Sequence, residues 1–508
     1  MIAVTQTRST EHAPRMGHSS TSKILPADDA HSGHIYINEW RSGGAGTHPI
    51  IDKATGTEIG STGLASARDV ETAAQSAKQA QKAWAATPGP YRGDVLRRFA
   101  ALLEDNVDAV AELVVRETGS IWLKGRWEVQ LSAREFIEAA ALASQPQGFV
   151  TNPTDKAAQS FVRRIPLGVV GIITPWNSPL ILGARSIAPA LALGNAVVIK
   201  PDLHTPLTGG AIFAELLERA GLPKGLFHVV PGGAQTGEAI VQNSDIDMIS
   251  FTGSTKVGRQ IGAAAGEKLK RVSLELGGNN PYVVLDDVDI KAAAAAGAWA
   301  AFFYQGQICM TGGRHIVHER ILDAYVQALV KNAESLTIGN PMDETVQIGP
   351  IINERQAQNV ERIIQETLQQ GGKLETGGSR EGLFFKPTVI SGVKPGMSGF
   401  DEERFGPVAV ITTFSDDEEA ISLANATEYG LSAAVVSPDI RRAQKMADRI
   451  RAGSVHLNDQ TIVHGLYGAI GGVGASGNGF GFGAVSNAEQ FSEWQWVTRH
   501  SEIPDYPF

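Results

Sequence analysis

The sequence predicts an α/β fold with more than one domain. From residue 169 onward, short apolar runs alternate with helix-like segments, which is the pattern of a parallel sheet covered by helices. The chain has 508 residues, of which 43% are apolar and 19% are charged, so it can bury a large core. Polar residues follow several of the apolar runs. Because α/β proteins bind ligands at the carboxyl ends of parallel strands, we expect a site there.

The expected elements follow the chain in order. Ser66 and Asp69 resemble a capping box, and apolar residues then recur at helical spacing as far as Trp84, so the N-terminal region is expected to be helical. Strands are expected over 169–174, 196–199, 227–230, 248–251, 272–276 and 282–285. Helices are expected over 185–193, through Leu216 and Leu217, over 257–264 and over 292–304.

Charge and apolar patterning exclude two classes of partner. The net charge of -10 would repel a phosphate backbone, and no basic run is interleaved with aromatic residues, so nucleic acid is not expected. No segment approaches the ~20 apolar residues that span a bilayer, and residues 1–30 lack the apolar stretch of a signal peptide. We therefore expect no membrane contact, a flexible tail over residues 1–33 and a cytoplasmic protein.

Cys309 is the only cysteine of the chain and ends the segment Gly306-Gln307-Ile308-Cys309, just after the helix-like run over 292–304. A single thiol cannot form an intrachain disulfide or supply more than one thiolate to a metal. Two roles remain, because free cysteine is often buried as a small apolar side chain, whereas a thiolate is a strong nucleophile. The single cysteine also fits a reducing compartment.

Two glycine-rich segments match phosphate-binding patterns. Residues 472–477 fit the dinucleotide fingerprint letter for letter, but they follow no strand and open no helix, so a loop is predicted. Residues 253–258 follow the strand over 248–251 and open the next helix. That arrangement presents backbone N–H groups to an anion such as pyrophosphate, although an ordinary capped turn has the same pattern. ATP is disfavoured, since Arg259 and Gln260 replace the Lys-Ser/Thr ending of an ATP-binding loop.

Glu275 and Asn177 complete a chemical set with Cys309. Glu275 ends an apolar run, where partial burial would tune a carboxylate to act as a general base. Asn177 follows the end of the strand over 169–174, and its side-chain amide can donate to a developing oxyanion without changing charge. Each residue taken alone also fits a turn or core role. Their joint occurrence favours catalysis.

Six motifs resemble, in order, those of the aldehyde dehydrogenase superfamily, and the resemblance covers residues 35–495. The motifs are Pro175-Trp176-Asn177, Lys200-Pro201, Phe251-Thr252-Gly253-Ser254-Thr255, Leu274-Glu275-Leu276-Gly277-Gly278, Gly306-Gln307-Ile308-Cys309 and Glu403-Arg404-Phe405-Gly406-Pro407. The resemblance implies a Rossmann-type cofactor domain, an α/β catalytic domain and a small β extension for oligomerisation into a homodimer or homotetramer. The implied divisions are 34–145 and 167–275 for the cofactor, 276–486 for catalysis, and 146–166 and 487–508 for oligomerisation.

The same resemblance assigns roles to residues. Cys309 would be the nucleophile, Glu275 the general base and Asn177 the oxyanion donor. An aldehyde has no leaving group, so hydride loss needs a tetrahedral alkoxide, which thiolate addition supplies; hydride transfer leaves a thioester, from which water releases the acid. The residues implied for NAD or NADP binding are Thr174, Trp176, Lys200, Gly253, Ser254, Glu403 and Phe405.

Within the superfamily the chain is most similar to benzaldehyde and related aromatic-aldehyde dehydrogenases. The shared segments are 185–195, 200–203, 306–310, 472–477 and 506–508. A flat aromatic aldehyde needs an apolar slot, for which Phe303, Ile470 and Trp176 are candidates, although each is equally a core residue. Many relatives have Phe at the position of Ile470. Many NAD-selective members carry a carboxylate where this chain has Leu203, so NAD is preferred and NADP stays open.

Other functions stay open. A CoA-acylating enzyme would use the same thiol, but that class typically lacks the glutamate base, so Glu275 argues against it. An aliphatic aldehyde is an alternative substrate. A cysteine hydrolase would need a histidine against Cys309, and His315 and His318 are predicted to lie on opposite faces of a strand, which also excludes them as a metal pair. A non-catalytic binding protein that retains the fold is the alternative from another class.

Overall fold

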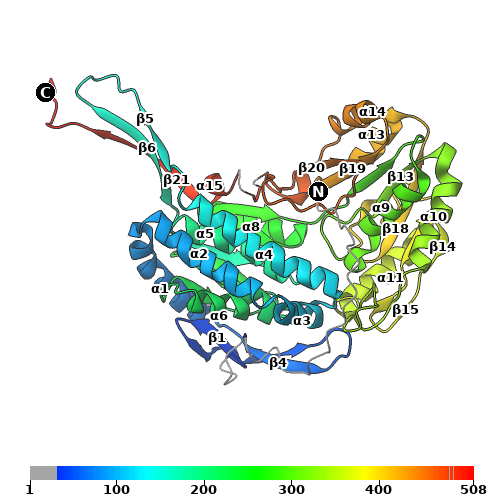
Figure 1. Cartoon of the computed structure of the whole chain (residues 1–508), viewed down its shortest axis with the longest axis horizontal. Helices are drawn as coiled ribbons and strands as arrows, with labels where there is room; N and C mark the ends of the chain where they lie inside the picture. Colours follow the sequence, from blue (N-terminus) through cyan, green and yellow to red (C-terminus); the bar gives the residue numbers. More distant parts are fainter. Residues whose placement is uncertain (1–23, 25–30, 480, 484–485, 508) are drawn as a thin grey trace.

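The structure is a computed structural model that describes residues 24, 31–479, 481–483 and 486–507. Most of the tail predicted over residues 1–33 lies outside the described residues. The expected α/β fold is confirmed. Two seven-stranded sheets, each packed against helices, form two lobes in the described part of the chain, and a three-stranded sheet extends away from the first lobe (Figure 1).

The first sheet contains the strands that lead to most of the predicted site residues. Its strands are β1 (His34–Ile37), β2 (Trp40–Ser42), β7 (Val169–Ile173), β8 (Ala196–Lys200), β9 (Phe227–Val229), β10 (Met248–Thr252) and β11 (Arg271–Glu275). The strand order is β11-β10-β7-β8-β9-β1-β2, and the five strands from β11 to β9 run parallel. The carboxyl ends of β7, β8, β10 and β11 therefore share one edge of the sheet.

Eight helices of the first lobe precede or alternate with these strands. They are α1 (Ala67–Ala86), α2 (Gly89–Glu104), α3 (Val107–Thr118), α4 (Trp122–Leu142), α5 (Pro179–Ala192), α6 (Ile212–Arg219), α7 (Ala234–Gln242) and α8 (Thr255–Glu267). The capping box of α1 is confirmed, because Ser66 Oγ accepts from the Asp69 N–H at 3.3 Å and the Asp69 carboxylate accepts from the Ser66 N–H at 2.8 Å.

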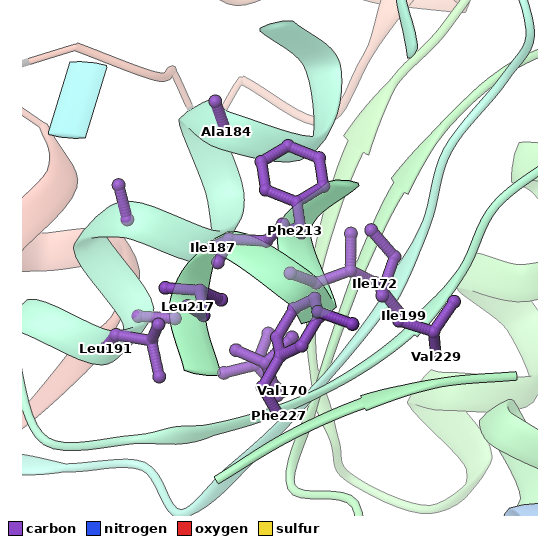
Figure 2. Packing of buried hydrophobic residues seen from close by; sticks show 14 of the residues in the cluster. Val170, Ile172, Ala184, Ile187, Leu191, Ile199, Phe213, Leu217, Phe227 and Val229 are labelled. Atoms are coloured by element: carbon purple, nitrogen blue, oxygen red, sulfur yellow. The ribbon is translucent and has the colours of Figure 1, made fainter. Parts of the chain in front are cut away.

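The core of this lobe lies between the parallel strands and the helices α5 and α6. Figure 2 shows Val170 and Ile172 of β7 and Ile199 of β8 close to Phe213 and Leu217 of α6, and all of these side chains are buried. Every residue of α5 is buried, which is expected for a helix that is apolar apart from Arg185 and Ser186. Such a helix holds the residues before it in a fixed position.

Three helices differ from the predicted boundaries, and one of them, α8, is longer at both ends than the predicted 257–264. Helix α5 begins at Pro179 and not at 185, because proline is well suited to the first helical position. The helix predicted over 292–304 is α9 (Ile290–Phe302), and it ends earlier because Tyr304 and Gln305 adopt positive φ angles of 51° and 54°. The chain therefore turns sharply before it reaches Cys309.

The second lobe is built on the other seven-stranded sheet. Its strands are β12 (Pro281–Val284), β13 (Arg314–His318), β14 (Lys373–Thr376), β17 (Thr388–Ser391), β18 (Val408–Phe414), β19 (Ser432–Val436) and β20 (Ser454–Leu457), in the order β14-β17-β18-β13-β12-β19-β20. The helices after α9 are α10 (Leu322–Glu334), α11 (Glu354–Gln369), α12 (Ser398–Asp401), α13 (Asp417–Asn425) and α14 (Ile440–Ala447). As predicted, His315 and His318 lie on one strand, β13.

The three-stranded sheet forms an arm. It consists of β5 (Gly148–Thr151), β6 (Gln159–Pro166) and β21 (Ser492–Arg499), in the order β21-β6-β5, and extends from the first lobe near α15 (Asn487–Gln490) (Figure 1). Two small sheets complete the described elements, formed by β3 (Thr47–Ile51) with β4 (Glu58–Gly63) and by β15 (Arg380–Glu381) with β16 (Phe384–Phe385). In the described part of the chain, every helix is too short or too polar to cross a membrane.

Candidate active site

The site forms where the chain leaves β11 and crosses toward the second lobe. Gly277 and Gly278 follow Glu275 after one residue, Leu276, and a Cβ at either glycine would come closer than 3.0 Å to a neighbouring atom. A Cβ on Gly277 would lie 2.5 Å from Oε2 of Glu403, and one on Gly278 would lie 2.2 Å from the carbonyl oxygen of Cys309. The two glycines thus let Glu275, Glu403 and Cys309 approach one another.

The Cys309 thiol lies among three charged side chains. Burial raises the pKa of Cys309 to about 12, the positive charge of Arg185 lowers it, and the carboxylates of Glu275 and Glu403 raise it further. Its carbonyl oxygen accepts a hydrogen bond from Nδ2 of Asn280 at 2.8 Å, which fixes the backbone at Cys309. Because the thiolate is the reactive form, the thiol needs a positive charge or a base when substrate binds.

Glu275 has the environment expected of a general base. The residue is 4% exposed, and its Oε1 accepts from the backbone N–H of Gly472 at 3.4 Å. Burial raises the pKa of Glu275 to about 8, and the charge of Arg185 and the Gly472 N–H oppose that rise. The segment 472–477 is a loop, as predicted, with one 3-10 turn at Gly474–Ser476. That loop forms one wall of the site and is not a phosphate-binding helix start.

The Asn177 side chain reaches the segment that leads to Cys309. Its Nδ2 donates to the carbonyl oxygen of Gln307 at 3.0 Å, and the residue is 5% exposed. An amide nitrogen carries two hydrogens. Gln307 is the one acceptor of this amide among the described residues, so a second N–H is left for an oxyanion.

Arg185 is a site residue that the sequence reasoning did not identify. Its Nη2 donates to Oγ1 of Thr252 at 2.9 Å, its guanidinium lies 4.4 Å from the centre of the Phe482 ring, and its Nε is buried without a partner among the described residues. Thr252 is paired in register with Glu275, so Arg185 stands beside the carboxylate. The signal in the sequence was a charged residue within an otherwise apolar helix.

Four predicted cofactor residues lie at the shared strand edge. Thr174 follows β7, and its Oγ1 is buried without a partner among the described residues. Lys200 ends β8, is 9% exposed and donates to the carbonyl oxygen of Pro201 at 3.3 Å. Gly253 and Ser254 join β10 to α8, and the Ser254 side chain leaves the first N–H groups of that helix uncapped. The uncapped N–H groups at the start of α8 and the unpaired hydroxyl of Thr174 can bind the polar groups of a dinucleotide.

The remaining residues predicted to bind the cofactor are brought together from the two lobes. Oε1 of Glu403 accepts from the Gly278 N–H at 2.9 Å, and burial raises the pKa of Glu403 to about 7. The rings of Trp176 and Phe405 meet edge to face with centroids 5.4 Å apart. Phe405 has a positive φ of 48°, which turns the chain sharply after Arg404. Trp176 therefore contacts a predicted cofactor residue.

Among the described residues, the ring stacking of Phe303 and the backbone bridge of Ile470, the two predicted substrate-pocket residues, are with neighbouring side chains and backbone, and not with Cys309. Phe303 is partly buried and stacks on Trp299, with ring centroids 4.3 Å apart and an interplanar angle of 11°. Ile470 forms an isolated backbone bridge with Phe482. His315 is also accounted for, because its Nδ1 shares a hydrogen bond with the Tyr325 hydroxyl at 2.8 Å in the second lobe. That partner gives His315 a structural role.

Comparison with known proteins identifies the class. The sequence model of the aldehyde dehydrogenase family matches residues 40–497, and the chain belongs to this family. The family resemblance inferred from the six motifs is thus confirmed.

Two relatives and one solved structure are similar to this chain over almost its whole length. The chain is 44% identical over 482 residues to a vanillin dehydrogenase from Amycolatopsis sp., covering 95% of this chain and 99% of the relative. It is 44% identical over 476 residues to a benzaldehyde dehydrogenase [NAD(+)] from Pseudomonas putida, covering 94% and 98%. Among solved structures, the betaine aldehyde dehydrogenase of Staphylococcus aureus in complex with NAD+ superposes with a TM-score of 0.92 at 30% identity, covering 96% and 99%.

The charge of Arg185 should be visible in the reactivity of Cys309. Because this positive charge favours the thiolate, Arg185→Met should raise the pKa of Cys309 and slow its alkylation by iodoacetamide at each pH below that pKa. We expect the pH profile of alkylation to move upward by about 1 pH unit or more. Cys309 is the only thiol, so incorporated label reports this residue alone. Arg185→Lys keeps the charge and serves as the control; identical profiles for wild type and Arg185→Met would contradict this account.

Proposed function

We propose that this protein oxidises an aromatic aldehyde to the carboxylic acid, with NAD as the hydride acceptor and Cys309 as the nucleophile. The observation that carries the proposal is the convergence of Asn177, Glu275 and Cys309 around a chain crossing where a Cβ on Gly278 would collide with the Cys309 carbonyl. The similarity to relatives named as vanillin and benzaldehyde dehydrogenases supports the aromatic substrate. Phe303, stacked on Trp299, and Ile470 are the side chains that we propose for its apolar slot.

The first chemical step falls to Cys309 and Asn177. The Cys309 thiolate adds to the carbonyl carbon, which gives a thiohemiacetal with a negative oxygen. The free N–H of Asn177 donates to that oxygen, and the backbone N–H of Cys309 is the second donor in this proposal. Arg185 stabilises the thiolate before attack, since its charge opposes the rise in the Cys309 pKa.

The second step falls to Glu275. Loss of a hydride from the thiohemiacetal carbon leaves a thioester on Cys309, and the NAD that the residues named below would hold would supply the hydride acceptor. Glu275 then removes a proton from a water molecule, and the hydroxide attacks the thioester and releases the acid and the thiol. With a pKa of about 8, the Glu275 carboxylate can both accept that proton and return it near neutral pH.

The residues proposed to hold NAD are Thr174, Trp176, Lys200, Gly253, Ser254, Glu403 and Phe405. The relative named for NAD(+) and the NAD+ complex of the solved neighbour support this choice over NADP. Leu203 leaves no carboxylate three positions after Lys200, and Asp202 accepts from the His204 N–H at 2.9 Å, which commits it to a turn. Activity with NADP should therefore be measured beside activity with NAD.

Two coarser features complete the proposal. We assign residues 34–145 and 167–275 to cofactor binding, 276–486 to catalysis, and 146–166 with 487–508 to oligomerisation, because these ranges follow the two large sheets and the arm. We also propose a cytoplasmic location, since a reducing compartment keeps a catalytic thiol free.

Activity with defined substrates tests the proposal. Benzaldehyde, vanillin and hexanal are each assayed with NAD and with NADP by absorbance of the reduced cofactor. We expect the aromatic aldehydes with NAD to be the best pairs, and Cys309→Ala to lower kcat by about three orders of magnitude or more. Activity that requires CoA would instead indicate an acylating enzyme, and preference for hexanal would indicate an aliphatic one. Absence of turnover with every pair would contradict the proposed function.

The arm is proposed to join copies of this chain into a homodimer or homotetramer. Its large apolar side chains are exposed, with Val150 86%, Trp496 71% and Phe149 57% accessible, and β21 is an edge strand. Val150→Glu should weaken association while leaving each subunit folded, because the side chain has few contacts to lose. Light scattering after size-exclusion chromatography would show a smaller species than wild type. A monomeric wild type would contradict this assignment.

A further inference from the structure

A buried ion pair on α4 contacts both halves of the active site. Lys124 and Glu128 are 1% and 0% exposed and lie one helical turn apart, with the ammonium donating to Oε2 of the carboxylate. Removing two charges from water is costly, and attraction between them offsets that cost only when other groups complete their hydrogen bonds. The other groups that bind Lys124 and Glu128 therefore show which parts of the site this pair holds in place.

The Lys124 ammonium has three contacts that match its three hydrogens. Besides Glu128, Nζ donates to the backbone carbonyl of Asn177 at 2.9 Å, and it lies 4.5 Å from the centre of the Tyr304 ring. Asn177 is the proposed oxyanion donor, and Tyr304 begins the sharp turn that leads to Cys309. One cation thus touches both segments that must meet around the substrate carbonyl.

The Glu128 carboxylate fixes the start of α5, just after Asn177. Its Oε1 accepts from the backbone N–H groups of Leu180 at 2.8 Å and Ile181 at 3.2 Å. These are orphan donors of the first turn of α5, and Ser178, at the N-cap, makes no side-chain cap. Glu128 therefore caps α5 from a neighbouring helix and holds the chain just after Asn177.

The turn before Cys309 requires such restraint. Tyr304 is fully buried with φ 51°, and Gln305 follows with φ 54°, which is the left-handed region and is strained for a residue other than glycine. Nε2 of Gln305 donates to the carbonyls of Gly119 and Pro350, at 2.9 Å each. Lys124 connects this strained turn to Asn177, because its ammonium lies over the Tyr304 ring and also donates to the Asn177 carbonyl.

We propose that Lys124 and Glu128 are positioning residues that set the Asn177 amide against Cys309, and so act on the rate of the chemical step through Asn177. This inference rests on the oxyanion role proposed for Asn177. In the alternative case, the Lys124–Glu128 pair only stabilises the packing of α4 against α5 and has no effect on the position of the Asn177 amide. The two cases differ in how their effects combine with loss of the Asn177 amide.

The experiment is a double-mutant cycle assayed with benzaldehyde and NAD. Asn177→Ala should lower kcat by about 10²–10³-fold. Lys124→Met should lower kcat by about 10–100-fold with little change in KM, because a misplacement of about 1 Å at the reacting atoms is enough for such a loss. If Lys124 acts through Asn177, the combined variant should be no slower than Asn177→Ala alone. Where Lys124→Met does not fold, Glu128→Gln takes its place in the cycle.

Arg92→Met is the matched control. Arg92 is a buried cation on α2 whose Nε donates at 2.9 Å to the carbonyl of Ala192, at the opposite end of α5 from Asn177. It should lower thermal stability while kcat stays within about twofold of wild type, since the first turn of α5 is undisturbed. Circular dichroism of each variant gives the folded state and the melting temperature.

The outcomes separate the two proposals. Losses that multiply in the combined variant, or an equal loss of kcat in Arg92→Met, would overturn the positioning role and leave the oxyanion role intact. Full activity of Asn177→Ala would overturn both. A large loss for Asn177→Ala, a smaller one for Lys124→Met and no further loss on combination would support both.

Discussion

The site depends on one close passage of the backbone. After β11 the chain runs between the Glu403 carboxylate and the Cys309 carbonyl, with too little space at Gly277 and Gly278 for a Cβ. This passage joins Glu275, the proposed base at the end of the first sheet, to the loop that carries Cys309, the proposed nucleophile. It also gives Glu403 a hydrogen bond from the Gly278 N–H. Groups that are far apart in sequence, at 275, 309 and 403, are thereby held together by backbone packing.

Electrostatics then decide how these groups can react. Burial alone disfavours both the Cys309 thiolate and the Glu275 carboxylate, and each negative charge raises the pKa of the thiol further. Arg185 is the positive charge that opposes both effects from a helix with no exposed residue. These opposing effects keep the Cys309 thiol and the Glu275 carboxylic acid mostly neutral in the free protein. The Cys309 thiolate and the Glu275 carboxylate then form as substrate and water arrive.

Much of the fold could be predicted because its signals are local. The strands from β7 to β12 are short runs, mostly apolar, and helices separate all of them except β11 and β12; the α1 cap depends only on Ser66 and Asp69. The chemical roles of Asn177, Glu275 and Cys309 came from residue type and motif. Arg185, Lys124 and Glu128 were missed because their importance lies in tertiary contacts that no spacing encodes. The early end of α9 was missed because Tyr304 and Gln305 are held in the left-handed region by distant partners.

The most direct test of the mechanism is to trap the thioester. Glu275→Gln should still add the aldehyde and pass on its hydride, but it lacks the base for hydrolysis. Mass spectrometry of this variant after reaction with benzaldehyde and NAD should show one benzoyl group per chain, on the peptide that contains Cys309. One equivalent of reduced cofactor should appear in a single burst. Steady turnover without any adduct, or an adduct on another residue, would contradict the account.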